Sequence, residues 1–448
     1  MSTDNNMSTS IRFYALADRL TQGLKPREVL TLFYSAEESD FVRFNKAKVR
    51  QAGHVAQASV DINLISGKRR VTSSVPLSGD NEVDWEMLVR HLEEERQRLA
   101  IAPEDPYLLY STTPASSEAI TKSGLLPANA MVDHILSAVQ GLDFVGIFAQ
   151  GHLHRGFANS LGQRNFFSTA NYNIDFCLYT GTDKAIKLGD AGFVFNKDTF
   201  KEKIEQAREA LPILKQTPKA LAPGKYRIYL TPTALHEVFS LLGWNAFGLK
   251  AQKTKQSALD RMVDGSSRLS EAVHLAEHTG AGFAPNFQEE GFVKPQRLEL
   301  ICAGKMASAL VSPRTAGEYD VPANGASENE SPESLDMAGG DLPTSAVLKE
   351  LGTGLYVNNL WYLNFSDRPN GRMTGMTRFA TWWVEHGQIV APVSVMRFDE
   401  SIYSMLGDKL MALTSERETL IDASTYGERS TASMCLPGAL IDAFSLTL

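Results

Sequence analysis

A histidine and a glutamate stand next to each other, His236 and Glu237, just after a segment that reads as a buried strand. An imidazole offers zinc a neutral nitrogen ligand, and a neighbouring carboxylate can take a proton from metal-bound water. Many zinc hydrolases begin their site in this way. The pair is therefore a candidate metal site, which would need at least one further ligand.

The helix that would carry this pair is well marked. Residues 226–230 alternate in the period-2 manner of a strand with one buried face, and Thr231 and Pro232 then suit the N-cap and the first helical position. Gly243 suits the end of the helix. An apolar stripe at helical spacing lies between them, formed by Leu235, Val238, Phe239 and Leu242. The sequence thus predicts a strand over 226–230 and a helix over 232–243.

The further ligand does not follow at the expected spacing. The zincin pattern would place the next histidine at position 240, which is Ser240, and one residue further on is Leu241. On its own, a histidine at the edge of an apolar stripe is more often packed or solvated than bound to a metal.

A second arrangement uses two other histidines. His274 and His278 are four residues apart, so a helix over 269–278 would place them on one face, and His236 could complete a three-histidine site. No spacing supports the third partner, and Gly280 and Gly282 follow closely. This reading would make the chain an independent metallopeptidase with a non-standard site.

Other reactive side chains have simpler interpretations. His152 and His154 flank Leu153 in a predicted turn or edge strand, where alternate residues point the same way. They could form a two-histidine clamp, but exposed loop histidines are the commoner case. Cys435, between Met434 and Leu436, reads as a packed thiol, and the acidic pair Glu289-Glu290 reads as a structural turn.

The composition of the chain argues against several classes of protein function. The net charge of −8 over 448 residues disfavours direct binding to nucleic acid, which needs clustered Lys and Arg. No apolar run reaches the roughly 18 residues of a membrane span, and the polar residues 1–10 show no signal peptide. Three scattered cysteines suit a reducing compartment. We expect a cytoplasmic protein with no membrane partner.

The first half of the chain mixes helices with alternating strands. The predicted helices are 11–24, 84–99, 129–140 and 199–211, and the predicted strands are 29–34, 40–51, 57–65, 68–75, 144–149, 155–160, 164–172 and 174–180. Turns are expected at Ala52-Gly53, Gly151 and Gly162. Alternating strands suggest an antiparallel sheet with one face covered by helices.

The second half reads as β-rich with few helices. Its predicted strands, besides 226–230, are 297–303, 307–311, 355–365, 375–385, 388–390 and 439–446, and its helices, besides 232–243, are 257–262, 269–278, 345–351 and 402–414. A long surface loop is expected over 314–341, and a Pro- and Lys-rich linker over 212–223. The predicted fold class is α+β, with an N-terminal domain over 1–211 and a C-terminal domain over 224–448.

Three stretches occur together in an informative order. The first is 155–162 (Arg-Gly-Phe-Ala-Asn-Ser-Leu-Gly), the second is 282–291 (Gly-Phe-Ala-Pro-Asn-Phe-Gln-Glu-Glu-Gly), and the third opens with 352–357 (Gly-Thr-Gly-Leu-Tyr-Val) and continues through 374–378 to 385–392. Together they resemble the TldD/PmbA family, also called modulators of DNA gyrase, over almost the whole chain. The resemblance implies an N-terminal α+β domain and a C-terminal β-rich domain that encloses a peptide-binding cavity.

That family contains two kinds of subunit. The TldD type carries an H-E-x-x-x-H motif and a late cysteine and is the zinc peptidase, whereas the TldE/PmbA type lacks these ligands and pairs with TldD. Here the motif positions fall either on His236, Glu237 and Leu241 or, in a register anchored on Gly243, on Phe239, Ser240 and Trp244. The place of the late cysteine looks like 426–428 (Tyr-Gly-Glu), and Cys435 lies too close to Pro437 to replace it.

Neither placement of the motif supplies a complete set of zinc ligands, because leucine and phenylalanine side chains offer no lone pair to a metal. An i, i+5 spacing also separates two side chains by about 140° on a regular α-helix, so a working site would need a locally widened turn. The resemblance therefore implies a TldE/PmbA-like chain without zinc, partnered by a TldD-like subunit that holds zinc, with unfolded peptide as substrate. The chain as a non-enzymatic protein-binding modulator remains a further alternative.

Overall fold

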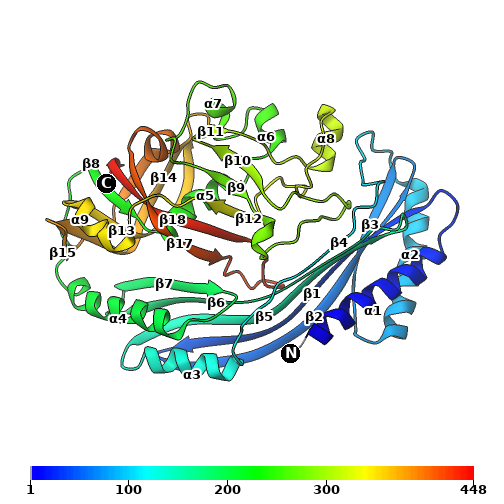
Figure 1. Ribbon diagram of the computed structural model, residues 1–448, viewed down its shortest axis with the longest axis horizontal. Coiled ribbons are helices and arrows are strands. Elements are labelled where there is room, and N and C mark those ends of the chain that lie inside the picture. Colours follow the sequence, from blue (N-terminus) through cyan, green and yellow to red (C-terminus); the bar gives the residue numbers. More distant parts are fainter. Residues whose placement is uncertain (1–2) are drawn as a thin grey trace.

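The computed structural model describes residues 3–448, which form two sheets that lie one above the other in Figure 1. The N-terminal sheet has the strand order β3-β2-β1-β5-β6-β4, and β7 also pairs with β6. Its strands are β1 (Val29–Asn45), β2 (Lys48–Ser66), β3 (Arg69–Pro76), β4 (Ser117–Ile120), β5 (Asp143–Asn159), β6 (Arg164–Tyr179) and β7 (Ala185–Gly192). All pairings are antiparallel except that of β4 with β6.

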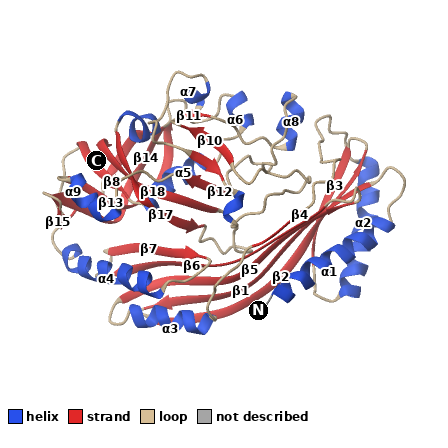
Figure 2. Cartoon of the chain, viewed as in Figure 1, coloured by secondary structure: helices blue, strands red, loops and turns tan. Residues whose placement is uncertain are grey.

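Four helices pack on one face of this sheet, which we call the outer face. They are α1 (Thr3–Gln22), α2 (Asn81–Ile101), α3 (Ala128–Ala138) and α4 (Lys197–Leu214). Even-numbered residues of β1 and β5 point to them: Tyr34 packs on Phe13 of α1, and Phe148 shares a core with Ile135 of α3. Figure 2 shows α1, α2 and α3 on the side of the sheet away from the C-terminal half. The predicted helix-covered antiparallel sheet is confirmed.

Several boundaries in this half differ from the prediction. The turn between β1 and β2 lies at Lys46-Ala47, and Gly53 continues strand β2. Strand β5 likewise runs through Gly151, where a turn was expected, whereas the turn at Gly162 is present. Helix α4 passes Pro212 and ends at Leu214. The predicted short strands therefore join into long ones.

The C-terminal half is built on an eleven-stranded sheet. Its strands are β8 (Gly224–Leu230), β9 (Leu275–Glu277), β10 (Leu298–Cys302), β11 (Lys305–Met306), β12 (Ser334–Met337), β13 (Gly354–Asp367), β14 (Arg372–Glu385), β15 (Gln388–Pro392), β16 (Arg397–Ser401), β17 (Leu410–Ile421) and β18 (Ser433–Leu446). Strand β8 pairs with both β13 and β18, and β14 and β16 connect those two, so five strands close into a ring. The α+β class is thus confirmed.

Five α-helices accompany this sheet in the described residues: α5 (Pro232–Gly243), α6 (Leu249–Lys253), α7 (Asp260–Val263), α8 (Pro313–Tyr319) and α9 (Val347–Leu351), with short turns of helix at Thr279–Ala281, Thr344–Ala346 and Ser404–Asp408. The apolar stripe of α5 lies at the centre of the largest core, with Leu235, Val238 and Phe239 almost fully buried. Helix α5 is therefore fixed by packing on its inner side.

Four predictions for this half are wrong. Residues 269–278 form loop and strand β9 in place of a helix, and 402–414 form a π-turn that leads into β17. The loop expected over 314–341 contains most of α8 and all of β12. The strand expected over 307–311 is absent from the described structure, where the hairpin partner of β10 is β11.

Candidate functional site

The start of helix α5 has the predicted cap. The Thr231 hydroxyl accepts a hydrogen bond from the Ala234 amide (3.2 Å) and donates one to the Asn358 carbonyl (2.7 Å). The first satisfies an amide that has no partner within the helix, and the second ties the helix start to strand β13. The cap and the buried stripe together fix which side chains of α5 face away from the core.

His236 and Glu237 are on that outward side and line a cavity of about 220 Å³. The cavity lies between α5, strands β6 and β7 of the N-terminal sheet, and the end of β17. The cavity has four further titratable lining residues: Asp175, Lys187, Asp190 and Asp422. The predicted pair thus sits where the two halves of the molecule meet.

Burial sets the protonation of this pair. Burial lowers the pKa of His236, with Lys187 acting in the same direction and Asp422 against it, so the imidazole is neutral at neutral pH. Burial also raises the pKa of Glu237, and Lys187 opposes that shift. Lys187 itself pairs with Asp175 at 3.4 Å. The site is therefore polar, and its lining holds four acidic side chains and one cationic side chain, Lys187.

The other motif positions do not face this cavity. Phe239 and Leu241 pack in the central core, 1 % and 7 % exposed, and Trp244, at the C-terminal end of α5, is 77 % exposed. The hydroxyl of Ser240 is the nearest neighbour on the helix, 3.5 Å from His236 Nδ1. Among the side chains that the structure describes, those of residues 9–448, no three His, Cys, Asp or Glu side chains gather in a way that would hold a metal ion. The residues present do not fit the zinc site of a metallopeptidase.

The alternative with His274 and His278 also fails on geometry. The predicted helix is absent. His274 immediately precedes strand β9 in the sequence, and His278 immediately follows it. His274 Nδ1 accepts from the Ala303 amide (3.4 Å), and His278 Nδ1 lies 3.9 Å from a carboxylate oxygen of Asp336. Neither forms a metal-binding group with His236 in the described part of the chain.

The connection between β17 and β18 is a part of the site that the sequence did not indicate. Figure 1 shows it reaching from the C-terminal half to the N-terminal sheet. Arg429, 3 % exposed, donates to the side chain of Asn171, and the Gly427 carbonyl accepts from Gln57 (2.6 Å). Residues 426–428, where the late cysteine was sought, belong to this connection. Its polar residues gave no periodic signal that could have revealed the contact.

The remaining candidates have structural surroundings. Cys435 is a half-buried residue of β18, and burial raises the pKa of its thiol. Glu290 pairs with Arg70 at 3.0 Å. The reading of His152 and His154 as exposed histidines is wrong, because β5 is an inner strand of the sheet. His154 is 6 % exposed and His152 is half-buried.

Comparisons with known proteins agree on one family. Residues 223–448 match the model of the PmbA/TldA metallopeptidase C-terminal domain. No curated protein matches the chain.

Three solved structures share the fold over nearly the whole length. TldE from Thermococcus kodakarensis is 15% identical with a TM-score of 0.79, covering 98% of this chain and 100% of that one. A protein described as a candidate modulator of DNA gyrase from Thermotoga maritima is 14% identical with a TM-score of 0.77, covering 97% and 100%. A similarly described protein from Bacteroides thetaiotaomicron is 14% identical with a TM-score of 0.74, covering 100% of both chains. The chain belongs to the TldD/PmbA family.

Proposed function

We propose that this chain is the zinc-free partner subunit of a TldD/TldE-type metallopeptidase complex that processes unfolded peptides. In this proposal a TldD-like subunit holds the zinc and activates water. The present chain supplies part of the wall of the peptide cavity and positions the substrate.

One observation carries the proposal. Helix α5 keeps its cap, its buried stripe and its position at the junction of the two halves, while its outward face presents His236 and Glu237 alone among the ligand types of the motif. Leu241 and Phe239 are committed to the core. A single imidazole with one carboxylate would hold Zn²⁺ poorly, since structural and catalytic zinc sites use at least three protein ligands. Helix α5 of the family fold is thus present, but the zinc ligands that it would carry are incomplete.

The structure also offers a surface suited to strand addition. Strand β3 pairs only with residues 59–66 of β2, so residues 48–58 have β1 as their one described strand neighbour. An open edge of this kind can accept an extended chain through main-chain hydrogen bonds, which makes recognition tolerant of side-chain sequence. This supports a substrate class of unfolded peptides, or docking of a partner's strand.

A cytoplasmic location is part of the proposal. The three cysteines are all unpaired, in keeping with a reducing compartment. No helix in residues 3–448 is long and apolar enough to cross a membrane.

Co-expression tests the proposal. The chain, tagged at one end, is expressed with a TldD-like protein from the same genome, and the purified material is assayed for complex formation by size-exclusion chromatography and for cleavage of an unstructured fluorogenic peptide. We expect a stable complex that cleaves the peptide faster than the TldD-like protein alone. Failure of the two chains to associate, with unchanged activity of the TldD-like protein, would contradict it.

A further inference from the structure

A groove of about 540 Å³ lies on the outer face of the N-terminal sheet, between helix α1 and strands β1, β2 and β5. It is on the face of the sheet away from the His236 cavity. Odd-numbered residues of β6, such as Asp175, point to that cavity, whereas even-numbered residues of β1 and β5, such as Ala36 and His154, point to the groove. Its volume is within the range of small-molecule sites. The groove is therefore a separate site from the His236 cavity.

Small side chains create this hollow. Strand pairing sets Ala36 of β1 opposite Ala58 of β2 and Glu38 opposite Ala56, so three alanines lie together on the floor. On the other side of β1, Ala36 is opposite His154 of β5. Because alanine extends only to Cβ, the floor is low, and the longer side chains around it form walls.

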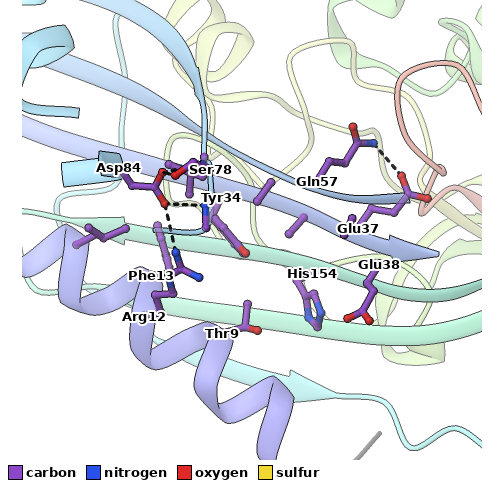
Figure 3. Close-up of a pocket in the computed structure, with 16 residues that line it drawn as sticks. Thr9, Arg12, Phe13, Tyr34, Glu37, Glu38, Gln57, Ser78, Asp84 and His154 are labelled. Carbon is purple, nitrogen blue, oxygen red and sulfur yellow. Dashed lines mark hydrogen bonds and ion pairs between the residues drawn. The ribbon is translucent and has the colours of Figure 1, made fainter. Parts of the chain in front are cut away.

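The walls carry polar groups without partners. His154 is 6 % exposed, and its Nδ1 has no hydrogen-bond partner. Glu38 lies opposite His152 of β5, and among the described residues no lysine or arginine forms an ion pair with it. Figure 3 shows Glu38 and His154 extending to the same side of the sheet, opposite Thr9 and Arg12 of α1. A buried polar atom without a partner is costly, so a ligand that satisfies it would be favoured.

The charges nearby select the kind of ligand. Arg12 is neutralised by Asp84 (3.3 Å), whose carboxylate also accepts from the Ser78 amide (2.6 Å) and hydroxyl (2.7 Å). Burial lowers the pKa of His154 to about 4, with His152 and Arg155 acting in the same direction, so its ring is neutral and one nitrogen can accept a hydrogen bond. Glu37, a second lining carboxylate, accepts hydrogen bonds from the Gln57 amide group (3.0 Å) and the Arg429 backbone amide (3.2 Å). The lining carboxylate left for a ligand is then Glu38, which favours a cation.

One wall of the groove is apolar. Phe13 and Leu16 of α1 line the groove, and the Phe13 ring stacks on that of Tyr34 at 5.1 Å. An ammonium brings three donors to the carboxylate and imidazole, and aromatic ring faces attract a cation. We propose that this groove binds a small primary amine with an apolar body, its ammonium held by Glu38 and His154 and its body lying over the alanine floor against Phe13.

The test uses the full chain at pH 7.5 with 2-phenylethylamine as the probe and 2-phenylethanol as its neutral analogue, followed by isothermal calorimetry and ligand-observed NMR. We expect the amine to bind about tenfold or more tightly than the alcohol, as a charge-assisted hydrogen bond would provide. No binding of the amine, or equal binding of the two probes, would overturn the proposal.

Three variants locate the site. Glu38→Gln should weaken amine binding about tenfold, since it removes the charge and keeps the shape. Glu86→Gln, an exposed glutamate of α2 outside the groove, should leave it unchanged. Ala56→Leu, at an exposed position where folding tolerates a larger side chain, should narrow the hollow and abolish binding. Amine binding that survives both Glu38→Gln and Ala56→Leu in folded protein would place the ligand elsewhere and refute the assignment.

Discussion

Arg155 of β5 and Glu428 of the β17–β18 connection form an ion pair that joins the two halves of the molecule, with Nη2 and Oε1 2.8 Å apart. The arginine side chain is buried, whereas the glutamate side chain is 41% exposed. Burial lowers the pKa of Arg155, and Glu428 opposes that shift. The contact holds the β17–β18 connection, whose Asp422 lines the His236 cavity, against the N-terminal sheet.

Removing the carboxylate should loosen this junction. Glu428→Ala leaves the buried Arg155 without its partner, and because solvent still reaches the pair we expect a loss of about 1 kcal/mol in unfolding free energy. Urea unfolding measures the loss. The matched control is Asp442→Ala at the exposed pair with Arg227, where a change within about 0.5 kcal/mol is expected. Equal losses of unfolding free energy in the two variants would mean that the Arg155–Glu428 pair contributes no more to stability than an exposed ion pair.

The pH dependence of stability should report the buried His154. Its pKa in the folded chain is about 4, below the ordinary 6.5, so between these values the unfolded chain binds a proton that the folded chain does not. Stability is then lost as pH falls from about 6.5 towards 4, by up to roughly 2 kcal/mol at pH 5. His154→Gln should remove this part of the slope.

Urea unfolding at pH 7.5 and pH 5 measures the difference. His386→Asn is the control, because this histidine is exposed and asparagine tolerates its φ of +51°. The control should keep the slope of the original protein. A His154→Gln slope as steep as that of the control would show that the imidazole does not titrate in this window.

Glu237 distinguishes a supporting role from a catalytic one. If zinc and water activation reside in the partner subunit, Glu237→Gln should lower kcat/KM of the complex by less than about tenfold, whereas loss of a general base usually costs about 10²–10⁴-fold. Peptide cleavage by the complex measures this. The exposed Glu350→Gln serves as the matched control. A loss of a thousandfold with an intact complex would assign the chemistry to this chain.

Local signals predicted the elements that local physics determines. Helix α5 begins and ends where Thr231, Pro232 and Gly243 indicate, because the start and the end of a helix depend on neighbouring residues in the sequence. The same reasoning failed for β1 and β2, where Lys46 and Ala47 take φ values of +52° at the turn while the more obvious Gly53 stays extended. Pairing along the whole strand outweighed the preference for glycine at the turn.

Apolar spacing alone could not separate a buried strand from a helix. Val273, Leu275 and Ala276 are fully buried, and their spacing fits either form, but pairing with β10 and β12 makes 275–277 a strand. This removes the shared helix face on which His274 and His278 were to meet. The contact of Arg429 with Asn171 spans 258 residues and depends on tertiary packing, so no local pattern could reveal it.

The metal content of the purified chain tests the central claim most directly. The chain is expressed alone in zinc-supplemented medium and analysed by inductively coupled plasma mass spectrometry, beside His236→Ala and beside the complex with a TldD-like subunit. The account predicts zinc well below one equivalent in the chain alone, no further loss in His236→Ala, and about one equivalent per TldD-like subunit in the complex whichever form of this chain is present. Stoichiometric zinc in the isolated chain that disappears in His236→Ala would contradict it.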